Sequence, residues 1–295
     1  TLMGLGSYPA SDEQFLGMIG MHGTDAAAKA FRRADTVIAC GMRFSDRVAG
    51  NRIRFGENKT VIQFDIDAAE IDKNVQTDLS VMADIDEIFK AILPVLAQGE
   101  RKEWLKEIAA YKEYETSRFN CRLPAYKIIS ALRTFTDADT RIATDVGQHQ
   151  MWTAQYYPFE KPRTFITSGG LGTMGFGMGA AIGSCIGSNK KTVLVTGDGS
   201  FHMNLNELCT AVSHHLPLLI LLMDNNCLGM VRQWQTLFYH KRYSQTTLDR
   251  KTDYVRLAEA FGATGLTIAG EKDIHPVLKQ AFPAVGAVLV DCKIG

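Results

Sequence analysis

The feature that most constrains the fold is a pair of short apolar runs that each stop at polar residues. The run 192–196 stops at the Gly-Asp-Gly triplet 197–199, and the run 217–223 stops at the Asp-Asn-Asn triplet 224–226. A segment with helical periodicity, 204–215, joins them. Apolar runs of this length joined by a helix are typical of neighbouring parallel strands. The sequence therefore predicts an open α/β sheet with both polar ends at one edge.

Alternation of helix and strand also runs through the first hundred residues or so. An alanine-rich helix is expected over 24–35, with Thr24 as its cap, followed by buried strands over 36–40 and 61–66. Helical periodicity returns at 84–96. This alternation is what an open α/β sheet requires, so we expect a separate sheet in this region.

A highly charged helical segment separates these elements from further strands expected at 141–146, 164–167 and 288–292. The predicted fold class is α/β, with two doubly wound and mostly parallel sheets. The expected domains are a partial middle domain over 1–97, a charged helical linker over 98–122 and a second domain over 123–295.

The composition favours a small-molecule partner. Lys and Arg number 32 and Asp and Glu number 32, so no net charge would attract nucleic acid or an anionic membrane. The six cysteines lack the spacing of a zinc site, and no apolar run is long enough for a membrane span. We expect reduced thiols and a soluble cytoplasmic protein, or one of an organelle stroma or matrix in a eukaryote. Abrupt ends at Thr1 and Gly295 lead us to expect a fragment.

The Gly-Asp-Gly triplet has the residue types of a site for a metal and a diphosphate. Its glycines allow a sharp turn and close approach to a diphosphate, and Asp198 offers a hard oxygen suited to Mg²⁺. An Asn side chain and a carbonyl after the next strand would complete an oxygen cage. A lone Gly-Asp-Gly is more often a plain strand-to-helix turn. The polar residues after the second strand favour the metal site.

Other segments leave structural alternatives open. The glycines of 168–179 allow close approach of a flat ligand or of neighbouring helices. His149 suits a structural or a functional role equally, and the helix with Trp234 could be part of a core. In the first domain, arginines in 41–47 and Asp65 at a strand end could bind a pyrophosphate and ribose hydroxyls, or form a surface salt-bridge cluster.

The order of strand, Gly-Asp-Gly, helix, strand and Asn resembles the signature of thiamine diphosphate enzymes. In that family the second residue of an Asn-Asn pair is a metal ligand. Here the pair is Asp224-Asn225, a departure at its first position, and Asn225-Asn226 is the alternative register. Asn225 is preferred because it leaves Gly229 and Met230 in the family's positions. The implied Mg²⁺ ligands are Asp198, Asn225 and the carbonyl of Cys227.

The segments 146–152, 168–179 and 229–235 are similar to those of the catalytic subunit of acetolactate synthase (acetohydroxyacid synthase). Met174 corresponds to the apolar wedge that holds the thiamine folded, and Trp234 to the tryptophan lining the pocket of the second 2-ketoacid. The resemblance implies catalytic roles for Met174, Met230, Trp234 and Arg47. It implies thiamine diphosphate contacts at Gly147, Gln148, His149, Ser168, Gly169, Gly172, Met174, Gly197, Asp198, Gly199, Ser200, Asn225, Gly229 and Met230.

The segments 20–23, 41–48 and 64–66 resemble the FAD-contacting segments of the same family. FAD would be structural rather than redox-active in this reaction. The family's acid at the last position can be Glu, so an Asp there is a mild departure. The implied FAD contacts are Met21, His22, Gly41, Arg43, Arg47 and Asp65, with Arg47 also bordering the substrate channel.

The resemblance implies that the protein decarboxylates pyruvate and joins the hydroxyethyl group to pyruvate or 2-ketobutyrate, in valine and isoleucine biosynthesis. It implies a homo-oligomer with its active site at a subunit interface and a regulatory subunit as a further partner. The activating glutamate of this family lies in an N-terminal domain of the neighbouring subunit, which no segment here resembles. We therefore expect the chain alone to be inactive or barely active. The alternatives are another thiamine diphosphate carboligase or oxidase, and a non-catalytic cofactor-binding module.

Overall fold

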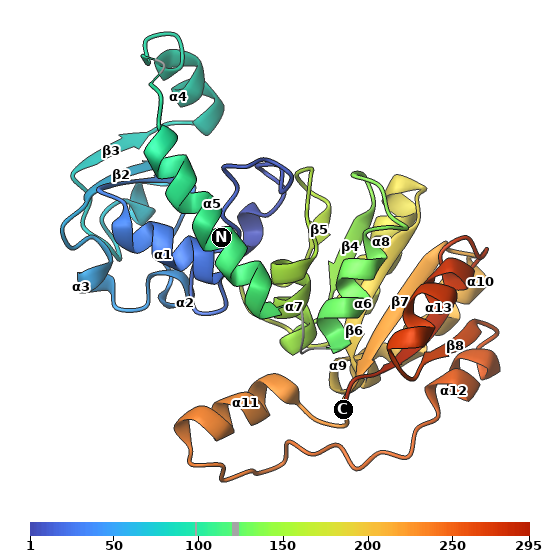
Figure 1. Cartoon of the computed structure of the whole chain (residues 1–295). Helices are drawn as coiled ribbons and strands as arrows, with labels where there is room; N and C mark the ends of the chain where they lie inside the picture. The colour runs from blue at the N-terminus through green and yellow to red at the C-terminus, as the bar shows by residue number, and fades with distance from the viewer. Residues whose placement is uncertain (98, 120–123) are drawn as a thin grey trace. The chain divides into compact units, whose positions relative to one another are not determined.

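A computed structural model describes residues 1–97, 99–119 and 124–295 (Figure 1). Contacts divide the chain into two compact units. Unit 1 comprises Thr1 and Asp12–Asn120, and unit 2 comprises Leu2–Ser11 and Cys121–Gly295. The expected boundary between 122 and 123, with residues 98 and 120–122 of the expected linker, lies outside the described residues. Each unit contains one parallel sheet, which confirms the α/β class.

Unit 1 contains a three-stranded sheet in the order β1-β2-β3. Its strands are β1 (Thr36–Cys40), β2 (Thr60–Asp65) and β3 (Leu79–Met82). Its helices are α1 (Asp25–Arg33), α2 (Asp46–Ala49), α3 (Arg52–Phe55), α4 (Ile85–Ile92) and α5 (Lys102–Phe119). The Thr24 hydroxyl accepts a hydrogen bond from the backbone N–H of Ala27 at 3.2 Å, so the expected helix cap is confirmed.

The charged segment expected as a solvated linker contains α5, which packs against α1 within unit 1. Ile108 of α5 is buried. The Glu115 carboxylate accepts hydrogen bonds from the backbone N–H groups of Asp25 and Ala26, at 3.0 and 3.2 Å. These N–H groups lie in the first turn of α1 and have no partner within that helix. A few apolar and acidic side chains of α5 thus hold it against α1. The expected connection was solvated and made no such contact.

Unit 2 contains a six-stranded parallel sheet in the order β5-β4-β6-β7-β9-β8. Its strands are β4 (Arg141–Thr144), β5 (Phe165–Ile166), β6 (Thr192–Gly197), β7 (Leu218–Asp224), β8 (Thr264–Ile268) and β9 (Val288–Lys293). Every residue of β6 and β7 is buried, as expected for central strands of a parallel sheet. The order places β4, β6 and β7 side by side.

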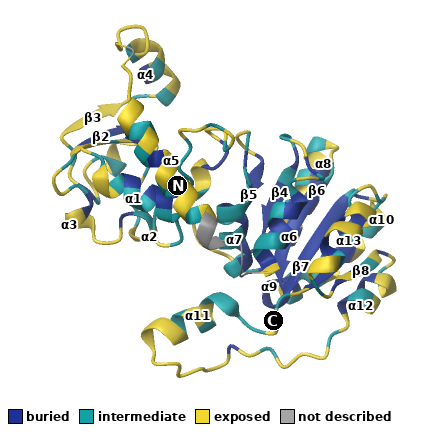
Figure 2. Cartoon of the chain, in the orientation of Figure 1, coloured by how far each residue is buried: buried dark blue, intermediate teal, exposed yellow. Residues whose placement is uncertain are grey.

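Helices cover both faces of this sheet, and its central strands are buried between them (Figure 2). The main core cluster joins α8, α10 and α12 to one face, while α6, α7 and α13 pack on the other. The helices are α6 (Pro124–Leu132), α7 (Gln148–Tyr156), α8 (Phe176–Ser188), α9 (Asp198–Asn204), α10 (Leu208–Ser213), α11 (Gly229–Phe238), α12 (Tyr254–Ala260) and α13 (Ile274–Ala281).

One expected helix and two strands differ from the sequence patterns. The helix expected at 204–215 begins at Asp198 and is interrupted by a 3-10 turn at Leu205–Glu207, because the Gly-Asp-Gly triplet itself starts the helix. Strands β3 and β8 were not expected, since β3 is fully exposed, β8 is only partly buried, and neither has a continuous apolar run. Across the described ranges, no helix has both the length and the apolar character to cross a membrane.

Candidate cofactor site

Three adjacent strands of unit 2 end at the same edge of the sheet. The register pairs Thr144 of β4 with Val195 of β6, and Gly197 of β6 with Met223 of β7. The segments that follow these strands start at residues 145, 198 and 225, so their side chains lie close together. Ligands of open α/β sheets bind at such carboxyl edges.

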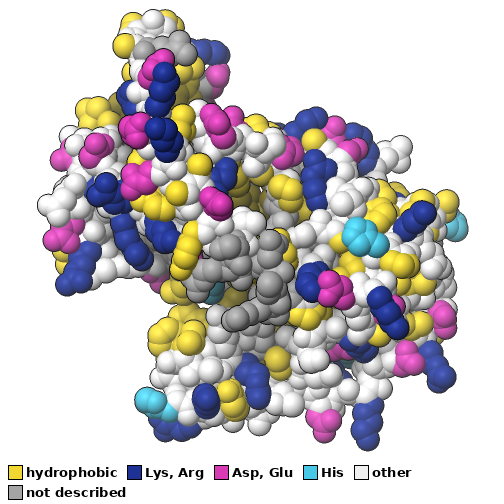
Figure 3. All heavy atoms as spheres, viewed as in Figure 1, with side chains coloured by type: hydrophobic (Ala, Val, Ile, Leu, Met, Phe, Trp, Pro, Cys, Tyr) yellow, Lys and Arg dark blue, Asp and Glu magenta, His cyan; other side chains and the backbone are white. Residues whose placement is uncertain are grey.

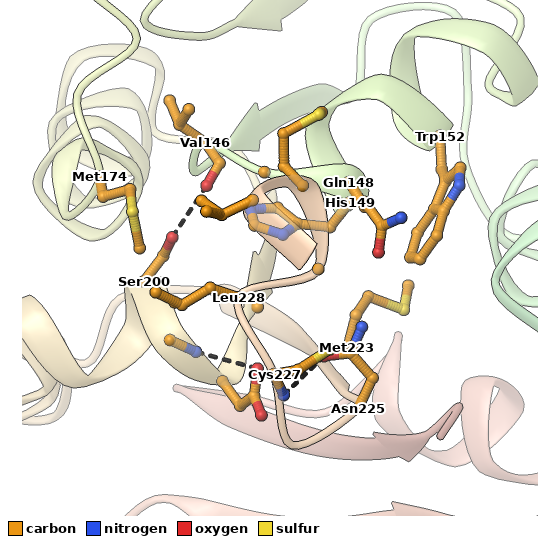
Figure 4. A pocket seen from close by; sticks show the side chains of 17 residues that line it. Val146, Gln148, His149, Trp152, Met174, Ser200, Met223, Asn225, Cys227 and Leu228 are labelled. Atoms are coloured by element: carbon orange, nitrogen blue, oxygen red, sulfur yellow. Dashed lines mark hydrogen bonds between the residues drawn. The ribbon is translucent and has the colours of Figure 1, made fainter. Parts of the chain in front are cut away.

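A pocket lies at this edge, with Met174 and Trp152 on opposite sides of it (Figure 4). The space between its walls is about 410 Å³, part of which is open to solvent. Its walls come from the ends of β4, β6 and β7 and from the starts of α7, α9 and α11. The lining residues are Val146, Gly147, Gln148, His149, Trp152, Met174, Gly197, Asp198, Gly199, Ser200, Met223, Asn225, Cys227, Leu228, Gly229, Met230 and Val231.

Several of the pocket glycines leave no room for a side chain. A Cβ at Gly197 would lie 2.8 Å from the His149 ring, and one at Gly147 would also lie 2.8 Å from it. A Cβ at Gly199 would meet Leu228 at 2.5 Å, and one at Gly229 would meet the Gln148 side chain at 2.0 Å. The turns therefore pack so tightly that the backbone forms part of the pocket wall.

Asp198 is a buried carboxylate, 2% exposed, at the start of α9. Burial, and then repulsion by the Asp224 carboxylate, raise its pKa to about 7. Its Oδ1 accepts a hydrogen bond from the Gly199 N–H at 2.9 Å, and its carbonyl accepts one from Arg250 at 3.1 Å. These bonds fix the turn, but the negative charge of Asp198 stays poorly compensated. A buried charge without compensation is energetically unfavourable, and a cation at this position would compensate it.

The two candidate metal registers differ in position. Asn225 lines the pocket, whereas Asn226 is exposed, has a φ of 53° and does not line it. The Asn225 Oδ1 accepts a hydrogen bond from the Cys227 N–H at 3.2 Å, which holds both residues in one turn. Within the described residues, no group of three His, Cys, Asp or Glu side chains could hold a metal ion. A metal here would therefore need amide and carbonyl oxygens beside Asp198.

His149 is neutral in this environment. Burial lowers its pKa to about 3, and a hydrogen bond to the Asp145 backbone opposes this only in part. Among the described residues its Nε2 is buried without a hydrogen-bond partner. A buried polar atom without a partner in a pocket wall fits a site that a polar ligand completes.

The other expected contacts in unit 2 fall into two groups. The side chains of Met174 and Met230 line the pocket, and the Ser200 hydroxyl donates to the Val146 carbonyl at 3.0 Å, which joins two of the strand ends (Figure 4). Trp234 does not line the pocket; it packs against Phe238 within α11, with ring centroids 5.1 Å apart. Three residues of the loop before α8 also lie outside the lining, namely Ser168, Gly169 and Gly172.

The expected FAD contacts lie near the carboxyl edge of the sheet in unit 1. Gly41 follows β1 and donates its N–H to the Phe64 carbonyl at 2.8 Å, and Asp65 ends β2. The Met21 N–H donates to the Arg47 carbonyl at 2.7 Å, and both burial and the Arg47 charge lower the pKa of His22. The Arg43 carbonyl accepts a hydrogen bond from Asn74. The structure thus brings Met21 and His22 beside Arg47, and places Gly41 and Asp65 at neighbouring strand ends.

Two residues that organise the site, Asp145 and Arg250, were not expected from the sequence. Asp145 is 1% exposed, and its carboxylate accepts hydrogen bonds from the N–H groups of Val146, Gly175 and Gly177. It therefore joins the end of β4 to the start of α8. It lies near the end of the strand expected at 141–146 and directly after the observed β4, and an acid near a strand end is the signal that identified Asp198. Arg250 carried no such signal, because its contact with the Asp198 carbonyl spans 52 residues of sequence.

Two family models match most of the chain. The C-terminal TPP binding domain of thiamine pyrophosphate enzymes matches residues 145–292, and the central domain of these enzymes matches residues 1–92. The first match covers the whole pocket edge, including both polar strand ends. The chain belongs to the thiamine pyrophosphate enzyme family.

The similar proteins are large subunits of acetolactate synthase. The isozyme 3 large subunit of Escherichia coli K12 is 40% identical over 296 residues, which covers 97% of this chain and 52% of that protein. The isozyme 2 large subunit of the same organism is 42% identical over 299 residues, covering 100% and 54%. The large subunit of Haemophilus influenzae is 40% identical over 292 residues, covering 96% and 51%. The chain thus spans about half the length of the curated relatives it matches.

Proposed function

We propose that this chain carries the thiamine diphosphate, Mg²⁺ and FAD sites of an acetolactate synthase large subunit. The observation that carries the proposal is the convergence of the buried Asp198 carboxylate, the Asn225 amide and tightly packed glycine turns in one pocket. The names of the relatives support the activity. The division into a partial middle domain (1–97), a linker (98–122) whose helix α5 packs on α1, and a cofactor domain (123–295) is part of the proposal.

Mg²⁺ would be held by Asp198, the Asn225 amide oxygen and the Cys227 carbonyl, all hard oxygen donors of the type that Mg²⁺ prefers. The raised pKa of Asp198 supports this assignment, because a buried carboxylate without sufficient positive charge is what a metal ion would stabilise. Cys227 would act through its backbone, since burial raises the pKa of its thiol and keeps it protonated.

Thiamine diphosphate would lie between the glycine turns and the methionines of the pocket. Gly147, Gln148 and His149 would face the diphosphate. Its negative charge would stabilise the protonated form of His149, whose Nε2 otherwise has no hydrogen-bond partner among the described residues. Met174 and Met230 supply apolar surface for the ring system. When bound, this cofactor supplies a carbon nucleophile and an electron sink for decarboxylating a 2-ketoacid. The chain's own part is to orient the cofactor and to exclude water from it.

The remaining parts of the proposal follow the resemblance. Unit 1 would hold FAD through Met21, His22, Gly41, Arg43, Arg47 and Asp65 as a structural group. Pyruvate and 2-ketobutyrate would be the substrates, with Trp234 favouring the second. The assembly would be a homo-oligomer with its active site at a subunit interface, joined by a regulatory subunit in the cytoplasm or an organelle. Ser168, Gly169 and Gly172 would approach the cofactor from outside the pocket lining.

Calorimetric titration of thiamine diphosphate into the chain, with and without Mg²⁺, tests the site. Binding that requires the metal and disappears in Asp198→Ala supports it, while metal-independent or absent binding at millimolar cofactor contradicts it. Acetolactate formation from pyruvate then tests the activity, with the chain alone and with the N-terminal half of a relative added. We expect product only with that half. Binding without turnover in both assays would favour the non-catalytic module, and a product other than acetolactate would favour another carboligase or oxidase.

A further inference from the structure

An ion-pair network lies beside the proposed metal position. Asp224, the last residue of β7, accepts a hydrogen bond from the Lys293 ammonium at 2.5 Å, and Asp291 accepts one from the same ammonium at 2.8 Å. Asp224 and Lys293 are direct register partners on β7 and β9. The two carboxylates are 3% and 5% exposed, whereas Lys293 is 46% exposed. One ammonium therefore serves two buried carboxylates.

Asp224 could compete with Asn225 for a metal ion, because its carboxylate lies within hydrogen-bond reach of the Asp198 carboxylate and repels its charge. A carboxylate is a stronger ligand for Mg²⁺ than an amide. Both Asp224 oxygens, however, already have partners. Oδ2 accepts from Lys293, and Oδ1 accepts from the Asn226 N–H at 3.4 Å, next to the turn that places Asn225 in the pocket.

We propose that Lys293 is a positioning residue of the metal site: it keeps the Asp224 carboxylate in an ion pair and cancels its charge, so that the ion binds at Asp198 and Asn225. The inference rests on the proposed Mg²⁺ and thiamine diphosphate site. Without the ammonium, an additional negative charge would act on that site. A cation would then bind more tightly and an anionic diphosphate more weakly. Damage to the fold alone would instead weaken the binding of both the cation and the diphosphate.

The test uses the full chain and two titrations followed by tryptophan fluorescence: Mn²⁺ at saturating thiamine diphosphate, and thiamine diphosphate at saturating Mn²⁺. In Lys293→Met we expect the Kd of Mn²⁺ to fall about fivefold and that of the cofactor to rise about fivefold, as for one partly screened unit charge nearby. Asp224→Asn should shift both constants in the opposite directions. The double variant should return both to within about twofold of the unmodified chain.

Two controls accompany these variants. Lys293→Arg keeps the charge and should restore both constants. Lys191→Met removes another half-buried lysine, whose ammonium donates to the Phe282 and Ala284 carbonyls beside the opposite end of β6, and should change neither constant. If Lys293→Met does not fold, the comparison of Asp224→Asn with the double variant replaces it, and removing the lysine should again tighten Mn²⁺ and weaken the cofactor.

Each outcome separates this inference from the proposed function. Metal-independent or absent cofactor binding by the unmodified chain would overturn the proposed site itself. Normal binding by the unmodified chain, with Kd values that stay unchanged or weaken together in Lys293→Met, would overturn the role of Lys293 alone. Opposite shifts that the double variant cancels would support it.

Discussion

The two parallel sheets of this chain follow the same local rules but have different carboxyl edges. In unit 2 every residue of β6 and β7 is buried, helices cover both faces, and polar residues at the strand ends are enclosed in a pocket. In unit 1 all four residues of β3 are exposed, and Met21 is 51% exposed. The difference indicates that polar residues at strand ends form a preorganised site only where helices cover the sheet and enclose them.

The same difference governs electrostatics. Burial raises the pKa of Asp198 to about 7, so its charge is costly and a metal ion can stabilise it. The ion pair of Arg47 with Asp46 in unit 1 is 63% and 60% exposed, and such pairs contribute little to stability. On the face seen in Figure 3, acidic and basic side chains are intermixed. We therefore expect substitutions at the edge of unit 2 to have larger effects than those in unit 1.

The largest expected effect is that of Asp198→Ala on cofactor binding. The variant should lose more than about a hundredfold in affinity for thiamine diphosphate at fixed Mg²⁺. Removing a metal ligand lowers metal affinity at least as much as removing a residue that only hydrogen-bonds to a ligand. Calorimetric titration measures this. Asp139→Ala removes an exposed carboxylate paired with Lys161 and should bind normally. Equal losses of cofactor affinity in both variants would contradict the expected difference between buried and exposed carboxylates.

Next in size is the effect of a methyl group on the packing of α8. Gly177→Ala places its Cβ 2.8 Å from the Asp145 N and 2.9 Å from Leu194, and should destabilise the chain by about 2 kcal/mol. Gly183→Ala, in the same helix, meets nothing within 4 Å and should stabilise it by up to about 1 kcal/mol. Urea unfolding of both variants gives the comparison. A neutral Gly177→Ala would show that this close approach is not required.

The pH dependence of metal binding sharpens the electrostatic contrast. Because the pKa of Asp198 is about 7, a metal must displace a proton below that pH. Metal affinity should rise about tenfold per pH unit up to roughly pH 7 and then level off. Calorimetry in buffers of different ionisation enthalpy should show one proton released per ion at pH 6. A flat profile between pH 5 and 7 would mean that Asp198 is already ionised in the free chain.

The pH dependence of thermal stability reports the pKa of Asp198 less clearly than metal binding does. The raised pKa of Asp198 makes its contribution to stability fall as pH rises from 3.8 to about 7. The lowered pKa of His149, about 3 against 6.5, makes its contribution rise with pH over nearly the same window. The two slopes oppose each other, so the binding experiment is the decisive one.

The smallest expected effect is in unit 1. Arg47→Ala should weaken FAD binding by only about threefold to tenfold, because the charge of an exposed arginine is screened by water. Fluorescence quenching of FAD measures it, and Arg54→Ala in the neighbouring α3 serves as the control. A loss as large as that of Asp198→Ala would mean that unit 1 also encloses its ligand, and the comparison between the units would fail.

The sequence alone determined the class of fold and the location of the candidate site. Continuous apolar runs at 192–196 and 217–223, each bounded by turn residues, are typical of buried strands, and polar residues after neighbouring parallel strands share one edge. This short-range logic led to Asp198, the glycines around it and the Asn pair after the second strand, and the resemblance to a known family favoured Asn225 and added the cofactors. It failed for β3, whose residues are all exposed, and for β8, which is only partly buried, because neither has a continuous apolar run.

Only the tertiary structure decided which residues face one another. It separated Asn225 from Asn226, left Trp234 outside the pocket lining, and paired Asp224 with Lys293, which lies 69 residues further along the chain. The physical reason is that register, burial and charge compensation depend on neighbours brought together by sheet pairing. Patterns of period two or 3.6 encode which face of an element is buried, but not which charge lies opposite it.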